Sequence, residues 1–123
     1  MSPRSSEFLE AAQRRLAAAE VVAKEDSSTA LSAAYYAMLY GARAALSERG
    51  ISAKTHRGVW HEFRRAFVES GEIDAGLAAS VQKLQPEREQ ADYDAWSAPA
   101  EDAQHAIELA RSFLSAIEKL FSA

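Results

Sequence analysis

The sequence predicts an all-α protein folded as an up-and-down bundle of about five helices. Apolar side chains recur with the 3.6-residue period of an amphipathic helix along most of the chain. No segment shows the period-two alternation or the hairpin turn signals of β-strands. The segments between the predicted helices are short, which favours antiparallel neighbours. The length of 123 residues suits one core, so we expect residues 1–123 to form a single domain.

Two long helices are predicted in the first half of the chain. The first runs from Ser6, its expected N-cap, to about Lys24, with apolar residues at Phe8, Ala12, Leu16, Ala19 and Val22. The second has the most regular pattern and ends before Gly50. Its apolar positions are Leu31, Ala34, Tyr35, Met38, Leu39, Ala42, Ala45 and Leu46. Small residues around Gly41 predict that another helix packs closely against it.

The second half predicts shorter helices and then one long helix. Thr55 is the expected N-cap of a third helix that ends near Gly71. A fourth segment runs from Asp74 to Leu84, and Pro86 then either kinks it or starts a new turn. Helical spacing resumes at Arg88 and reaches Asp92. The last helix carries an apolar stripe from Ala103 to Phe121.

Composition excludes several classes of protein. Hydrophobic residues make up 48% and charged residues 26% of the chain, which is typical of a globular protein. No apolar run reaches the roughly 18 to 20 residues that span a bilayer, and the first residues lack the apolar stretch of a signal peptide. We therefore expect a cytoplasmic protein. The chain has no cysteine, which excludes disulfides, thiolate catalysis and cysteine-ligated metals.

The net charge of −4 is unevenly distributed. Between Arg43 and Phe67 there are six basic residues and two acidic ones, whereas the rest of the chain is acidic. This asymmetry allows a basic patch that could meet phosphate groups. An ordinary solvated surface with internal ion pairs explains it equally well.

Metal and cofactor sites are not predicted. His56 and His61 lie five residues apart, which separates them by about 140° on a helix, whereas zinc-binding histidines lie four apart on one face. The sequence contains no P-loop, GxGxxG, HExxH, EF-hand or GxSxG motif.

One candidate binding face lies on the second predicted helix. Tyr36, Tyr40 and Arg43 follow i, i+4, i+7 spacing and therefore share a face. Aromatic rings can stack on bases, and a guanidinium group matches phosphate oxygens. Alternatively, the tyrosines surround the core with their hydroxyl groups at its edge.

A second candidate is the segment 88–94. On a continuous helix Arg88 and Asp92 are i, i+4 neighbours, and an ordinary ion pair would explain them.

Several short strings together resemble the HEPN family (higher eukaryotes and prokaryotes nucleotide-binding), in its small bacterial branch with an Arg…Ala-Asp-Tyr motif. They are residues 34–40 (AYYAMLY), 44–46 with Gly50, 55–59 (THRGV) with Phe63, residues 67–68 with Gly71, and Arg88 with residues 91–93 (ADY). The resemblance covers the chain from the first helix to the last.

The resemblance implies a helical bundle that is often a homodimer, encoded beside a minimal nucleotidyltransferase in a toxin-antitoxin arrangement. Many members are metal-independent endoribonucleases whose motif is an arginine followed four to six residues later by a histidine. Arg88 matches the arginine, but the positions for the histidine hold Tyr93, Asp94 and Ala95. A tyrosine of ordinary pKa near 10 is a poor base at neutral pH.

Three hypotheses follow from these residues. In the first, the protein binds nucleotide or nucleic acid beside a nucleotidyltransferase partner, Arg88 holds a phosphate, and Tyr93 stacks on a base or accepts a nucleotide. The candidate nucleotide- or phosphate-binding residues are Tyr36, Tyr40, Arg43, His56 and Arg57. In the second, Arg88 and Asp92, with or without His56, cut single-stranded RNA across a dimer interface. The third is a non-catalytic dimeric interaction bundle.

Overall fold

A computed structural model describes residues 1–93 and 97–122, and of residues 87 and 90–93 it describes the backbone alone. Over these ranges the chain forms six α-helices and one π-helical turn, without a strand. The helices are α1 (Pro3–Val22), α2 (Ser27–Glu48), α3 (His56–Phe63), α4 (Ala75–Gln82), α5 (Leu84–Tyr93) and α6 (Ala100–Phe121), and the π turn η1 (Arg64–Val68) continues α3.

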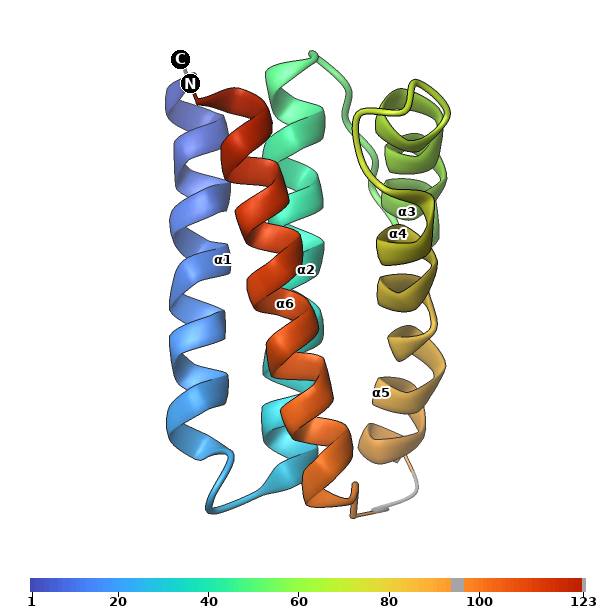
Figure 1. Ribbon diagram of the computed structural model, residues 1–123. Helices are drawn as coiled ribbons and strands as arrows, with labels where there is room; N and C mark the ends of the chain where they lie inside the picture. Colours follow the sequence, from blue (N-terminus) through green and yellow to red (C-terminus); the bar gives the residue numbers. More distant parts are fainter. Residues whose placement is uncertain (94–96, 123) are drawn as a thin grey trace.

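The long helices α1, α2 and α6 lie side by side, with both chain termini at one end (Figure 1). The shorter helices α3, α4 and α5 lie on the other side of the bundle, where α3 and α5 contact α2 and α4 contacts α6. A single residue, Lys83, separates α4 from α5, so these two helices form one interrupted segment. The predicted all-α bundle of about five helices is therefore confirmed. No described helix is long and apolar enough to cross a membrane.

The ends of the helices follow capping rules, with one correction. Helix α1 begins at Pro3 rather than at Ser6, because the Ser2 hydroxyl accepts the Ser5 N–H and proline suits the first helical position. Thr55 caps α3 as predicted, with its hydroxyl accepting the Gly58 N–H at 2.9 Å. Pro86 is the third residue of α5, where its missing N–H breaks no helical hydrogen bond.

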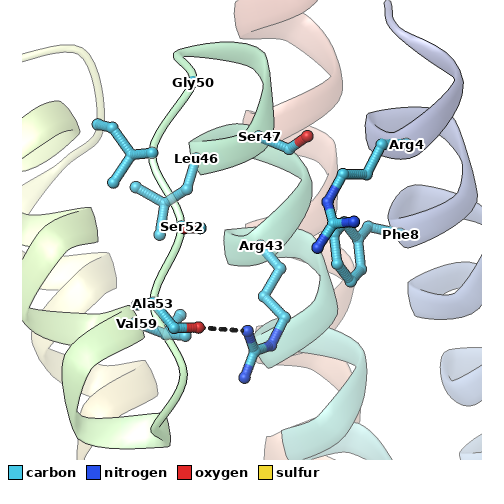
Figure 2. A pocket seen from close by; sticks show the side chains of 10 residues that line it. Arg4, Phe8, Arg43, Leu46, Ser47, Gly50, Ser52, Ala53 and Val59 are labelled. Carbon is cyan, nitrogen blue, oxygen red and sulfur yellow. Dashed lines mark hydrogen bonds between the residues drawn. The ribbon is translucent and has the colours of Figure 1, made fainter.

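Helix α2 ends in a tight turn that can be followed in Figure 2. Gly50 has a φ of 70°, a conformation that favours glycine. The N–H of Gly50 donates to the Ser47 carbonyl at 3.0 Å, and the N–H of Ile51 donates to the Leu46 carbonyl at 2.9 Å. This pair of bonds is a Schellman motif, which satisfies the last carbonyl groups of the helix.

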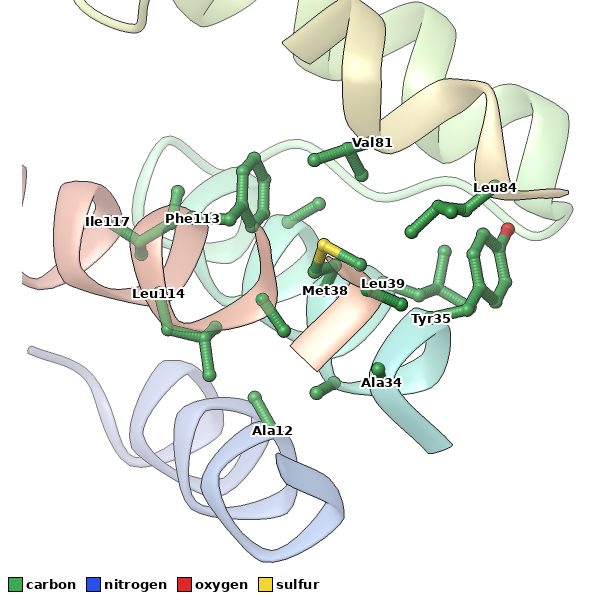
Figure 3. Packing of buried hydrophobic residues seen from close by; sticks show 14 of the residues in the cluster. Ala12, Ala34, Tyr35, Met38, Leu39, Val81, Leu84, Phe113, Leu114 and Ile117 are labelled. Atoms are coloured by element: carbon green, nitrogen blue, oxygen red, sulfur yellow. The ribbon is translucent and has the colours of Figure 1, made fainter. Parts of the chain in front are cut away.

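The core is built around α2, which packs against α1 on one side and α6 on another (Figure 3). At Gly41 the side chain of Leu114 in α6 comes so close to the backbone of α2 that a Cβ atom there would lie 2.5 Å from the Leu114 Cδ2 atom. Tyr35 lies at the edge of this core beside Leu84 and is fully buried. Helix α2 thus forms the centre of the core. It also carries Tyr36, the residue after Tyr35, at the candidate site.

Candidate functional site

Arg88 of α5 lies against two tyrosine rings of α2. Its guanidinium carbon is 5.2 Å from the ring centre of Tyr35 and 5.3 Å from that of Tyr36. One guanidinium nitrogen, Nη1, donates to the Tyr36 hydroxyl at 3.4 Å, and Nη2 lies 3.8 Å from the Glu89 carboxylate. The side chain of Arg88 is only 12% exposed. The rings hold this cation largely out of water, where its charge acts more strongly than at an open surface.

His56, the first residue of α3, joins the same cluster. Its ring meets Tyr36 edge to face with centres 5.7 Å apart, and its Nδ1 atom lies 3.5 Å from the Tyr35 hydroxyl. Burial lowers the pKa of His56 below its ordinary value, and the positive charges of Arg88 and Arg43 lower it further. The imidazole is therefore neutral at pH 7, a form that can accept a proton.

Tyr35 anchors the cluster to the core. Its hydroxyl accepts the indole N–H of Trp60 at 3.1 Å, and both side chains are buried. Burial raises the pKa of Tyr35, so its hydroxyl stays protonated at neutral pH. This buried hydrogen bond fixes α3 against α2 and so positions His56 beside Tyr36.

Arg15 of α1 extends the cluster along the surface. Its guanidinium carbon is 5.7 Å from the ring centre of Tyr36 and 5.5 Å from that of Tyr40. Tyr40 in turn stacks with Phe8 at 6.3 Å, and Arg4 lies over Phe8 at 5.3 Å. We call this row of stacked side chains the arginine–aromatic ladder. In order of contact it consists of Arg4, Phe8, Tyr40, Arg15, Tyr36 and Arg88.

Two surface hollows flank the ladder. One of about 390 Å³ is lined by Arg4, Phe8, Arg14, Arg15 and Tyr40, together with Glu7 and Ala11. The other, of about 360 Å³, is lined by Arg15, Tyr36 and four small residues, three of which carry hydroxyl groups. Arginine and tyrosine side chains at the walls of such hollows can contact phosphate oxygens and bases.

The comparisons with known proteins agree with the fold. The family model described as "HEPN domain" matches residues 5–120, which is nearly the whole chain. The chain belongs to the HEPN family. Its relatives include the Methanocaldococcus jannaschii protein named "Putative toxin MJ0142", which is 31% identical over 91% of this chain and 78% of the relative.

Two further relatives resemble this HEPN protein over much of its length. A second protein of the same archaeon, named "Putative toxin MJ0605", is 30% identical over 91% of this chain and 84% of its own length. A Thermotoga maritima protein named "UPF0332 protein" is 33% identical over 75% of this chain and 70% of its own length.

The HEPN fold brings only some of the predicted site residues together. Tyr36 contacts both Arg88 and His56, and Tyr40 lies further along the ladder, across Arg15. Arg43 turns toward the loop before α3, where its Nη1 donates to the Ala53 carbonyl at 2.8 Å. Arg57 is exposed and lines a separate hollow of about 380 Å³ beside α5.

The remaining predicted residues lie at the end of α5. The backbones of Asp92 and Tyr93 belong to this helix, but their side chains are outside the described part of the protein. Asp94 and Ala95 lie outside the described residues altogether. The ion pair predicted between Arg88 and Asp92 therefore stays a prediction, whereas the contact between Arg88 and the neighbouring Glu89 is described.

The sequence did not predict the position of Arg15 over the tyrosine rings or the hydrogen bond from Trp60 to Tyr35. Arg15 is an exposed residue of the first helix, and nothing in the local sequence separates it from Arg14. Only the packing of α1 on α2 places its guanidinium over Tyr36 and Tyr40. A tertiary contact of this kind leaves no periodic signal in the sequence.

Proposed function

We propose that this HEPN protein binds a phosphate-bearing ligand, a nucleotide or RNA, at Arg88, Tyr36 and His56, as the toxin-like member of a pair with a minimal nucleotidyltransferase. The observation that carries the proposal is the guanidinium group of Arg88, held against the rings of both Tyr35 and Tyr36, with His56 against the same tyrosines. A guanidinium fixed in this way is preorganised to meet phosphate oxygens. The toxin names of two relatives support the biological setting.

The ladder favours RNA or another single strand as the larger ligand. Bases stack on aromatic rings, and arginines beside them contact the backbone phosphates. The rings of Tyr36 and Tyr40, with Arg15 across both, offer these two kinds of contact in alternation.

Binding is tested with a fluorescently labelled single-stranded RNA of about ten nucleotides, long enough to cover several stacking positions. We expect Arg88→Gln to weaken binding by about tenfold or more, because a hydrogen bond to a charged group contributes about 1.5–3 kcal/mol. Arg15→Gln, an exposed position whose replacement leaves the core intact, should weaken binding by a smaller factor. Fluorescence anisotropy measures both.

The matched control is Arg65→Gln, which removes the same charge from a side chain that is 63% exposed and outside the ladder. Equal weakening by Arg65→Gln and Arg88→Gln would mean that binding follows net charge alone, and the proposed site would then be wrong. Circular dichroism of each variant verifies that the helices remain folded.

The position of His56 favours ribonuclease activity as a second candidate function. This chain has no histidine at the motif positions after Arg88, but the fold brings His56 to the same pair of tyrosines. A neutral His56 would take the proton of a ribose 2′-hydroxyl as its oxygen attacks phosphorus. The bond to the 5′ oxygen then breaks, water protonates that oxygen, and Arg88 stabilises the charge on the phosphate.

Cleavage is read from the same RNA on a gel, in the presence of a metal chelator. The expected result is cleavage by the wild type that is lost in both His56→Ala and Arg88→Gln. Cleavage that survives either change, or an RNA that the wild type leaves intact, would exclude this candidate.

Partnership with a nucleotidyltransferase rests on the family resemblance and on the proposed role of Tyr93 as an acceptor. Incubation with the cognate nucleotidyltransferase and ATP should add one nucleotide to the protein, as measured by intact mass. Tyr93→Phe should abolish the addition, and Tyr40→Phe, the control, should retain it. Addition that persists in Tyr93→Phe would rule out that tyrosine. The predicted homodimer and cytoplasmic location stay predictions.

A further inference from the structure

A pocket of about 240 Å³ lies between the first turns of α1, the last turns of α2 and the loop that leads to α3 (Figure 2). It touches the end of the ladder at Arg4 and Phe8 but includes neither Arg88, Tyr36 nor His56. Its lining residues are Arg4, Phe8, Arg43, Leu46, Ser47, Gly50, Ile51, Ser52, Ala53 and Val59.

The pocket is shaped by the Schellman turn at the end of α2. The positive φ of Gly50 reverses the chain, and the bond from the Ile51 N–H to the Leu46 carbonyl brings these two apolar side chains to one wall. Val59 of α3 is fully buried and backs this wall from behind. The apolar wall therefore follows from a defined turn of the backbone.

The charged residues of the pocket are both cations. Arg4 is exposed and Arg43 is half-buried, and none of the ten lining residues is acidic. The guanidinium group of Arg43 is oriented by one hydrogen bond, from Nη1 to the Ala53 carbonyl at 2.8 Å. A guanidinium has five N–H donors, so this contact leaves donors for a ligand. The hydroxyl groups of Ser47 and Ser52 add polar atoms nearby.

We propose that this pocket binds a small phosphomonoester, with its phosphate between Arg4 and Arg43 and a compact apolar or planar body against Leu46 and Ile51. Two guanidinium groups match the double negative charge of a phosphomonoester better than the single charge of a carboxylate. The volume of about 240 Å³ is below the range of pockets for drug-sized ligands, so the body of the ligand is small.

Three probes separate the two parts of this ligand. Phenyl phosphate carries the phosphate and a planar body, inorganic phosphate carries the charge alone, and phenol carries the body alone. We expect phenyl phosphate to bind at least tenfold more tightly than either of the others, as measured by isothermal titration calorimetry. Equal affinity for phenyl phosphate and inorganic phosphate would overturn the proposal, because the apolar wall would then contribute nothing.

Two variants locate the binding. Arg4→Gln removes one cation from an exposed position, and Ser47→Phe fills the pocket without a change of charge. Both should weaken the binding of phenyl phosphate at least fivefold. Arg65→Gln, the charge-matched control, should leave it unchanged. If Arg4→Gln and Ser47→Phe both bind as tightly as the wild type, the pocket is not the site.

This inference can be tested apart from the proposed function, because the pocket shares Arg4 and Phe8 with the ladder but does not include Arg88. The variant Arg88→Gln should retain its affinity for phenyl phosphate even though its affinity for RNA is weakened. If Arg88→Gln loses affinity for phenyl phosphate and Arg4→Gln retains it, the ligand binds at the Arg88 cluster. That result would overturn the inference and leave the proposed function intact.

Discussion

His56 shows how one side chain acquires its chemistry from its neighbours. It is half-buried, and it faces the cations Arg88 and Arg43 together with the acidic residue Glu89, whose charge acts in the opposite direction. Desolvation and the two cations disfavour a second positive charge, so the pKa of His56 falls below its ordinary value near 6.5.

The pKa of His56 should respond to the charge of Arg88. Arg88→Gln should raise the pKa of His56 toward its ordinary value, because one of the two repelling cations is removed. Titration of the imidazole signals by NMR measures it, and Arg65→Gln is the control that should leave His56 unchanged. A wild-type pKa at or above 6.5 would contradict the described environment.

The lowered pKa also couples the fold to pH. The unfolded chain takes up a proton on His56 near pH 6.5, whereas the folded protein takes it up at lower pH. The unfolded state therefore binds more protons in this window, and the contribution of His56 to stability decreases as the pH falls through it.

The residues of the site differ in how far the sequence could predict them. Tyr36 was predicted from helical spacing, and Arg88 became a candidate through the family motif. Neither the spacing nor the motif could show that Arg88 meets Tyr36, since 35 residues separate α2 from α5 and the two helices meet only through tertiary packing. Arg43 has the predicted spacing, yet its guanidinium turns to the Ala53 carbonyl because the loop before α3 passes beside it.

At the scale of elements, the contact between α2 and α6 depends on Gly41. A Cβ atom there would come within 2.5 Å of Leu114, which is itself buried. A glycine inside a helix costs about 1 kcal/mol relative to alanine, so its position here is explained by close packing rather than by helix propensity.

We expect Gly41→Leu to destabilise the protein by about 1–3 kcal/mol, because overpacking of the core outweighs the gain in helix propensity. Urea denaturation measures this change. Ala18→Leu, which adds a side chain at an exposed position of α1, is the control and should change stability by less than about 0.5 kcal/mol. An unchanged free energy of unfolding in Gly41→Leu would contradict this expectation, because it would show that α6 can move away from α2 without cost.

The number and order of the elements were predicted well, whereas their ends were predicted less well. The long stripes of α2 and α6 have several turns of regular spacing, so their existence did not depend on any single residue. The predicted N-cap of α1 was four residues too late because Ser6 and Ser2 are equally good caps by residue type. Pro3 at the first position decides between them.

For the whole molecule, α2 links stability to the proposed function. Its inner face forms the core, and at the edge of that core Tyr35 and Tyr36 receive α5 through Arg88 and α3 through His56. Helix α1 adds Arg15 from the other side. Three helices that are separate in sequence thus converge on two adjacent tyrosines, which explains why the cluster could not be assembled from local patterns.

The central claim is that this cluster receives a phosphate of a nucleotide or RNA. Its most direct test is a titration of isotope-labelled protein with a short single-stranded RNA, followed by NMR at the side chains. We expect the signals of His56, of the Arg15 and Arg88 guanidinium groups and of the Trp60 indole N–H to shift together and saturate, and we expect Arg88→Gln to abolish these shifts. Shifts confined to the exposed basic residues of α3 and η1, with the cluster unchanged, would contradict it.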